Sequence, residues 1–229
     1  MTREQTPRSR IRAGFTQTDL LVTLAVLAGL TVLVVIPWQR SQGGAQLAVC
    51  LNNLKQVNQA VLAFANDHSQ TFPGPLADQG ELQWWYKEQV KGYAGLKGPS
   101  SANDAVFACP QDRGYSDPRP FWQSARFDYG SYNFNGVIQP GAPSLAGWPV
   151  SAVKEPRRTL LTMEWTAHGP LSWHRSRTGL KNAPFYRDAE SVVGFVDGQV
   201  ALTRIYFDGY TAAYLRDPIP GYAYRYSGN

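Results

Sequence analysis

Residues 14–37 read GFTQTDLLVTLAVLAGLTVLVVIP. From Leu20 to Ile36 no residue carries a charge, and only two threonines are polar. As a helix, the stretch from Phe15 to Ile36 would be about 33 Å long, which is enough to cross a bilayer. The sequence therefore predicts a transmembrane helix over 15–37.

A basic stretch precedes this apolar segment. Residues 1–14 contain four arginines and a single acid, Glu4. Because basic flanks stay on the cytoplasmic side, residues beyond 37 are expected outside the cytoplasm. One acidic residue, Asp19, lies in the first turns of the apolar segment, where a carboxylate is costly unless it has a partner.

The order of basic leader, Gly14, Phe15, Thr16, two further residues, an acid and an apolar helix resembles the signal of type IV prepilins. The resemblance implies that a prepilin peptidase cuts after Gly14 and that the new terminal residue, Phe15, is N-methylated. It also implies that Asp19, at a position where the family has Glu, pairs with the amino terminus of a neighbouring subunit. The alternative is a signal anchor that is never cut.

Four later stretches extend the resemblance to a pseudopilin-like family abundant in Planctomycetes and Verrucomicrobia. They are CLNNLKQ (50–56), FACPQD (107–112), SYNFNG (131–136) and GFVDGQV (194–200). The chain departs from that family at two points. Gln199 stands where the family's terminal motif has His, and the nearest histidine before Asp197 is His174 rather than one nine residues away.

The pattern along the chain predicts an α+β, pilin-like fold: a long N-terminal helix packed on a C-terminal antiparallel sheet with long loops. Apolar residues recur every three or four positions from Leu47 to Phe64, which predicts an amphipathic continuation of the helix over 38–66. Pro37 and the glycines at 43–44 are expected to interrupt it. Residues 67–229 are predicted to form a globular extracytoplasmic domain.

Within that domain, residues 70–158 contain ten of the sixteen prolines and read as loops anchored by aromatic residues, with a short helix over 82–93. Strand patterns come later, at 159–163 and on either side of Asp197-Gly198. Asp-Gly suits a two-residue turn, so 191–205 is predicted to be a hairpin.

The two cysteines, Cys50 and Cys109, both lie on the side where disulfides persist. A bridge between them would tie the loop-rich middle of the chain to the helix, and two buried free thiols are the alternative. Two cysteines are too few for a Cys-rich zinc site.

No catalytic pattern or cofactor motif is found, so we predict neither an enzyme nor a cofactor. His68, His168 and His174 lack recognised metal or hydrolase spacing and are interpreted as surface or structural residues. Asp197 and Asp208, each followed by Gly, could bind calcium in loops, but Asp-Gly is first of all turn chemistry.

Charge argues little for nucleic-acid binding. The chain has 22 Lys and Arg against 17 Asp and Glu, and residues 1–14 carry most of that excess. The Arg157-Arg158 pair is interpreted as a solvated surface.

The resemblance implies a structural subunit of a type II secretion pseudopilus or a type IV pilus-like filament. Its expected partners are a prepilin peptidase, other pilin or pseudopilin subunits, an inner-membrane assembly platform and, before assembly, membrane lipid. The expected location is the inner membrane with a periplasmic domain, and then a periplasmic or surface filament. The alternative function is a membrane-anchored extracytoplasmic enzyme or binding module.

Processing is the first testable prediction. The mature chain should begin at Phe15 and carry a methyl group on its amine, because Gly14 separates a basic leader from an apolar helix. Intact-mass measurement on membrane-extracted protein checks this, and replacing Gly14 by a bulky residue should block the cut. A mature form that retains Arg12 would contradict it.

Overall fold

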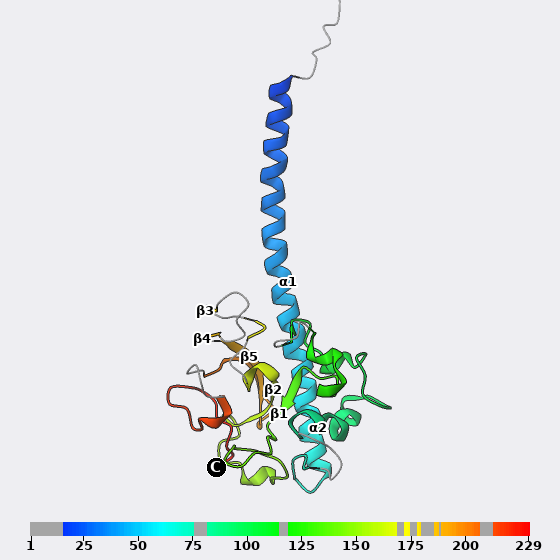
Figure 1. The fold of residues 1–229 in the computed structure, drawn as a ribbon, viewed down its shortest axis with the longest axis vertical. Coiled ribbons are helices and arrows are strands. Elements are labelled where there is room, and N and C mark those ends of the chain that lie inside the picture. The colour runs from blue at the N-terminus through cyan, green and yellow to red at the C-terminus, as the bar shows by residue number, and fades with distance from the viewer. Residues whose placement is uncertain are drawn as a thin grey trace, which may run out of the picture. The chain divides into compact units, whose positions relative to one another are not determined.

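The computed structural model describes residues 16–75, 82–114, 119–168, 172–174, 178–179, 186–187, 189–206 and 213–229. The chain divides into two compact units, Met1–Gly44 and Ala45–Asn229. A long helix and a four-stranded antiparallel sheet make it α+β, as predicted (Figure 1).

Helix α1 runs from Gln17 to Asp67 (Figure 1). The predicted interruption at Pro37 and Gly43–Gly44 is wrong, since the helix continues through all three residues. In a helix interior, proline and glycine are less favourable than alanine by about 3 and 1 kcal/mol. The residues on either side can still form their helical hydrogen bonds, so the helix continues. The boundary between the two compact units, after Gly44, nevertheless falls at this weak point.

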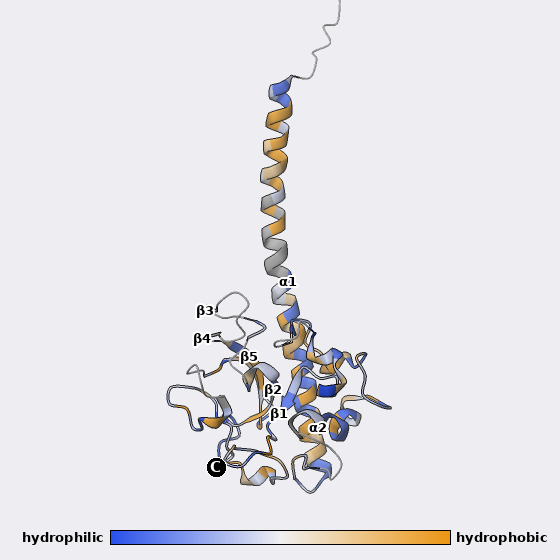
Figure 2. Ribbon diagram, in the orientation of Figure 1, coloured by the Kyte–Doolittle hydropathy of each residue, from blue (hydrophilic) through white to orange (hydrophobic). Residues whose placement is uncertain are grey.

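Apolar residues make up much of the first part of α1, where the ribbon in Figure 2 has many orange turns. Those whose exposure the structure describes are 44–71% exposed; they include Leu21, Leu30 and Leu33. Among the described residues, no helix is both long and apolar enough to cross a membrane. The transmembrane assignment of 15–37 stays a prediction.

The second unit begins within α1, at Ala45, so residues 45–67 belong to the same compact body as the rest of the domain. The predicted apolar stripe is buried there: Cys50, Leu54, Val57 and Val61 are fully inaccessible to solvent. They share one hydrophobic core with residues of the sheet, including Phe134, Leu161 and Val192. This half of α1 is therefore a structural part of the domain.

The main sheet has the strand order β1-β2-β5-β6, all neighbours antiparallel. Its strands are β1 (Tyr132–Phe134), β2 (Leu160–Glu164), β5 (Glu190–Phe195) and β6 (Val200–Arg204). The predicted hairpin of β5 and β6 is confirmed, but the predicted two-residue turn is wrong. The backbone N–H of Phe195 donates to the carbonyl of Gln199, which leaves three residues in the turn, and of Asp197 and Gly198 only Gly198 has a positive φ, +91°. The sequence did not predict β1, which is only three residues long.

Shorter elements fill the rest of the second unit. Helix α2 spans Leu82–Val90 and continues as a 3-10 turn, Lys91–Ala94, close to the predicted short helix. Two short strands, β3 (Thr178–Gly179) and β4 (Tyr186–Arg187), pair with each other. Further 3-10 turns are Ala105–Phe107, Phe121–Gln123, Ala125–Phe127, Val150–Ala152, Trp165–Ala167 and Ala213–Leu215.

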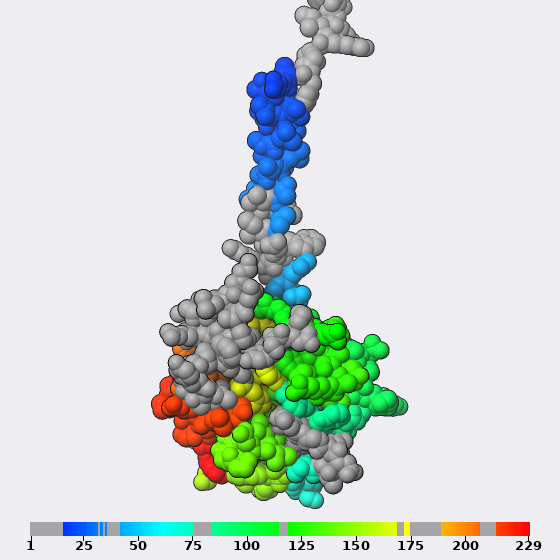
Figure 3. Space-filling view, in the orientation of Figure 1, coloured from blue at the N-terminus to red at the C-terminus, as the bar shows by residue number. Residues whose placement is uncertain are grey.

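The loop-rich stretch of residues 70–158 is called the middle segment. Aromatic side chains hold its described loops, as the sequence predicted. Phe121 packs on Phe127 and on Trp165, with ring centroids 4.4 and 4.6 Å apart, and Trp84 of α2 lies 4.8 Å from Phe127. Such contacts let a proline-rich segment bury area without regular structure. Figure 3 shows this segment, in green, and the C-terminal segment, in red, on one face of the second unit.

A second core lies against the sheet. It consists mainly of residues of the sheet and of the C-terminal segment, residues 213–229. It contains Met163, Val193, Ile219, Tyr224 and Tyr226, all buried. The C-terminal segment also forms a parallel bridge, Arg225 with Thr159, beside the start of β2. The sheet is thus covered by α1 and the middle segment in one core and by the chain's end in the other.

A single polar side chain joins α1 to the centre of the sheet. Asn58, fully buried, donates from Nδ2 to the carbonyl of Phe195 (3.0 Å) and accepts at Oδ1 from the hydroxyl of Thr162 (2.7 Å). It fits because residue 194 is glycine: a Cβ there would lie 2.5 Å from Asn58 Oδ1 and 2.8 Å from Thr162 Oγ1.

Gly194→Ala should therefore destabilise the protein by roughly 1–3 kcal/mol, the usual cost of overpacking. Urea unfolding followed by fluorescence measures this. Gly92→Ala is the matched control, because a Cβ at Gly92 has no atom within 4 Å and should cost little. In Asn58→Ala the clash with the amide is removed and only the one with Thr162 Oγ1 remains, so adding Gly194→Ala to it should cost less than in the parent chain. Equal costs in both backgrounds would contradict the proposed fit.

Candidate functional site

Cys50 of α1 and Cys109 of the middle segment form a disulfide, with their Cα atoms 4.8 Å apart. This confirms the predicted pairing, and both residues are fully buried. Asn53 supports it from one turn along the helix, by donating to the carbonyls of Ala105 and Ala108 at 2.9 Å each. Two residues of the CLNNLKQ stretch thus attach the middle segment to α1.

The FACPQD and SYNFNG stretches meet beside the disulfide. The carboxylate of Asp112 accepts hydrogen bonds from the backbone of Gly114 and Phe121, both at 2.8 Å, and from the hydroxyl of Ser131 at 2.7 Å. Ser131 Oγ in turn accepts from the backbone N–H of Cys109. The hydroxyl of Tyr132 donates to the carbonyl of Cys50 at 3.2 Å. These stretches therefore form one network around the disulfide.

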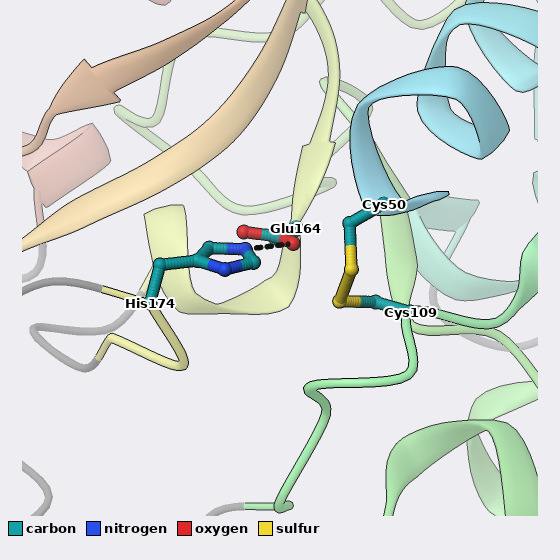
Figure 4. Close-up of side chains that lie close together, drawn as sticks. All are labelled: Cys50, Cys109, Glu164 and His174. Carbon is teal, nitrogen blue, oxygen red and sulfur yellow. Dashed lines mark hydrogen bonds and ion pairs between the residues drawn. A yellow bond between two sulfur atoms is a disulfide. The ribbon is translucent and has the colours of Figure 1, made fainter. Parts of the chain in front are cut away.

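Glu164 and His174 lie against the disulfide, as Figure 4 shows. His174 Nε2 is 2.7 Å from Glu164 Oε1, and the two side chains are 1% and 0% exposed. His174 Nδ1 contacts Gln111 Oε1, and Glu164 Oε2 accepts from the backbone N–H of Val192 at 2.7 Å. Glu164 ends β2, while His174 comes from the loop beyond it.

Both ring nitrogens of His174 have a polar partner in the interior. An oxygen is an acceptor, and His174 lies between the Gln111 amide oxygen and the Glu164 carboxylate. The 2.7 Å contact places a proton between His174 Nε2 and Glu164 Oε1, so the two groups form a hydrogen-bonded pair. A buried carboxyl group requires such a partner, so His174 satisfies Glu164 inside the domain.

The Glu164–His174 pair was not predicted from the sequence. His174 was interpreted as a surface or structural residue, and the structure places its side chain in the interior, paired and adjacent to the disulfide. No motif spacing links Glu164, His174 and the two cysteines, because a strand end, a loop and a helix bring them together. One signal for this site is present in the sequence: His174 is the last histidine before the Asp197-Gly198 turn.

The remaining histidines are structural. His68 follows α1, stacks on Phe64 with ring centroids 3.8 Å apart, and contacts the Phe64 carbonyl through Nδ1. His168 is buried, and burial lowers its pKa to about 4, so the ring is neutral near pH 7. Its Nδ1 lies 3.0 Å from the side-chain amide of Asn133.

Asp19 lies in the first turn of α1 and has a local partner there. Its carboxylate accepts hydrogen bonds from the backbone N–H and the hydroxyl of Thr16, at 2.9 and 2.7 Å, while Thr16 Oγ1 accepts from the backbone N–H of Asp19. This reciprocal arrangement is a capping box, which satisfies N–H groups at a helix start. Gly14 and Phe15 lie outside the described residues.

Asp197 behaves as a turn residue. Its Oδ1 accepts from the backbone N–H of Gln199 at 2.9 Å, and its Oδ2 lies 3.8 Å from Arg157 Nε. A cation next to this carboxylate opposes calcium binding. The second calcium candidate, Asp208, lies outside the described residues. Arg157 is 84% exposed, in keeping with a solvated surface.

Comparison of the chain with protein-family models, with curated proteins and with solved structures finds no match in any of the three.

The buried carboxyl of Asp112 generates a prediction about pH. Burial raises its pKa from 3.8 to about 6. The folded chain therefore binds a proton there in a range where the unfolded chain does not, and this contribution to stability is lost as the pH rises through about 6. Urea unfolding at about pH 5 and about pH 7.5 should show a larger loss of stability in the parent chain than in Asp112→Asn.

Other titrating groups are common to both chains, so the difference between the two losses isolates Asp112. Equal losses would show that its pKa is not raised by burial.

Proposed function

We propose that the protein is a pilin-like structural subunit, which is anchored in the inner membrane as a precursor and assembles into a type II secretion pseudopilus or a type IV pilus-like filament. The domain stands outside the cytoplasm, and the apolar part of α1 exchanges lipid contacts for contacts with other subunits. The partners are the prepilin peptidase, the inner-membrane assembly platform and other pilin or pseudopilin subunits.

One observation carries this proposal: α1 is a single helix with two kinds of surface. From Ala45 onward it is built into the domain core, whereas large apolar side chains between Leu20 and Val35 are 44–71% exposed. An apolar surface of this kind needs lipid or protein around it. A helix that is structural at one end and apolar at the other suits a subunit whose helices pack together.

The disulfide network supports the same proposal. It fixes residues 50–58 of α1 rigidly to the middle segment and the sheet, so the domain and its part of the helix move as one body. A load applied to the helix is then transmitted to folded structure through covalent and buried contacts. The environment that this disulfide requires is oxidising, as expected outside the cytoplasm.

Asp19 has two candidate roles, as a cap for its own helix and as a charge partner for the amine of a neighbouring subunit. The two roles require different atoms. The cap needs both Thr16 and Asp19, because each accepts a hydrogen bond from the other. The intersubunit pair needs only the carboxylate, so the two roles can be separated by substitution.

Asp19→Ala should lower incorporation into sheared and sedimented filaments by at least about tenfold, since an amine left unpaired in an apolar bundle costs roughly 3–5 kcal/mol. Thr16→Ala removes both hydrogen bonds of the Thr16 hydroxyl from the cap but keeps the carboxylate, and should assemble at close to the parent level. Asp19→Glu keeps both features and should also assemble. Membrane levels of each variant serve as the control.

Normal incorporation of Asp19→Ala would show that the charge is not an assembly contact, and would favour a plain membrane anchor. Equal defects in Thr16→Ala and Asp19→Ala would instead assign Asp19 to the cap alone.

A further inference from the structure

The side chains around the disulfide are a zinc-ligand set. Cys50, Cys109, Glu164 and His174 each offer one ligand atom, and all four atoms lie within 4.8 Å of one another (Figure 4). Thiolate, imidazole and carboxylate are the donors that zinc takes in proteins. We propose that reduction of the disulfide converts this cluster into a four-ligand site for Zn²⁺. The inference does not depend on the filament role.

The geometry requires only small changes. In a tetrahedral centre with bonds of about 2.0–2.3 Å, ligand atoms are about 3.3–3.8 Å apart. The ligand atoms of the cluster already lie within 4.8 Å of one another, and the sulfur atoms, bonded at 2.11 Å, must separate once the bond breaks. Shifts of about 1–2 Å in the side chains close the difference.

The groups behind the ligands are also in place. His174 contacts the Gln111 amide oxygen through Nδ1, which leaves Nε2 facing Glu164 and the sulfur atoms. A metal-binding histidine commonly donates its other N–H to such an oxygen, which fixes the ring and its tautomer. Glu164 Oε2 is held by the backbone N–H of Val192, so its Oε1 is oriented toward the site.

A dithiol or phosphine reductant supplies two electrons, the S–S bond breaks, and two protons convert the sulfur atoms to thiols. Binding of Zn²⁺ then releases both thiol protons and the proton between His174 Nε2 and Glu164 Oε1. Two thiolates and one carboxylate around Zn²⁺ leave a net charge of −1, the same as in an ordinary Cys₃His zinc centre.

The same cluster explains why the oxidised chain should not bind the metal. Disulfide sulfur carries no negative charge, and zinc binds the thiolate form of cysteine. Without the sulfur atoms, the cluster offers only Glu164 and His174, and these already bond to each other. Cys50 and Cys109 therefore either bond to each other or bind the metal, and the two states exclude each other.

The test uses the full chain in detergent, oxidised and after phosphine reduction, with Co²⁺ as a spectroscopic probe. We expect the reduced chain to bind one equivalent and to show thiolate-to-cobalt charge-transfer absorption with tetrahedral d–d bands, which equimolar Zn²⁺ abolishes. The oxidised chain should show neither. Zn²⁺ should also raise the Tm of the reduced chain and leave that of the oxidised chain unchanged.

Two variants separate this site from adventitious thiol binding. Glu164→Gln and His174→Gln should each weaken the affinity of the reduced chain by more than about tenfold, since even groups behind the ligands contribute 10–100-fold. His68→Gln is the matched control, because His68 lies outside the cluster and should leave the affinity unchanged.

Far-UV circular dichroism records folding in each state. Absence of the charge-transfer band in the reduced chain, whether folded or unfolded, would overturn the proposal. Equal affinity in the parent chain and both cluster variants would also overturn it, because the cysteines would then bind the metal without Glu164 and His174.

Discussion

The buried amide of Asn58 is the contact on which the arrangement of the domain depends. It bonds to the Phe195 carbonyl of β5 and to the Thr162 hydroxyl of β2, the two central strands. An amide placed in an apolar interface is costly unless it is fully bonded, so this contact admits a single register of helix against sheet. With that register set, Cys50 lies two turns earlier on α1, where Cys109 reaches it.

Glycine at position 194 is the complement of Asn58. Any side chain there would occupy the space of the amide and of Thr162 Oγ1. The GFVDGQV stretch thus has two separate structural roles. Gly194 leaves room for Asn58 of the helix, and Asp197-Gly198 lies in the turn that leads into β6. A polar residue on a helix and a glycine in a strand are a matched pair that neither position reveals alone.

Local patterns in the sequence predicted what local energetics determine. The α+β class, the buried stripe of α1, the β5–β6 hairpin and the disulfide all follow from periodicity, turn chemistry or the presence of only two cysteines. Strand β1 was missed because Tyr132–Phe134 is too short for an alternating pattern to be read, and its partner β2 lies almost thirty residues away. The predicted helix break failed because single helix-breaking residues act against a long, continuous ladder of hydrogen bonds.

The Glu164–His174 pair could not be predicted because its energetics are entirely non-local. Both residues are charged types that are found on surfaces in most proteins, and only the closed fold removes them from water. Each of the two buried side chains has the other as its polar partner, so the pair needs no ligand to be accommodated in the interior. No fixed sequence spacing is needed either, because any loop that brings His174 to the end of β2 forms the same pair.

The division of α1 between the two compact units separates the residues that hold the folded domain from the exposed apolar segment. Every contact described above that fixes α1 in the domain involves Cys50 or a residue beyond it, including Asn53 and Asn58. Changes in the segment before Gly44 therefore leave the core of the second unit complete. In the proposed function the exposed apolar segment makes the contacts with lipid or with other chains, while the disulfide and the hydrogen bonds around it belong to the folded domain. The contacts within the domain and the exposed apolar surface involve different residues of one helix. The sequence of each part can therefore change without altering the other part.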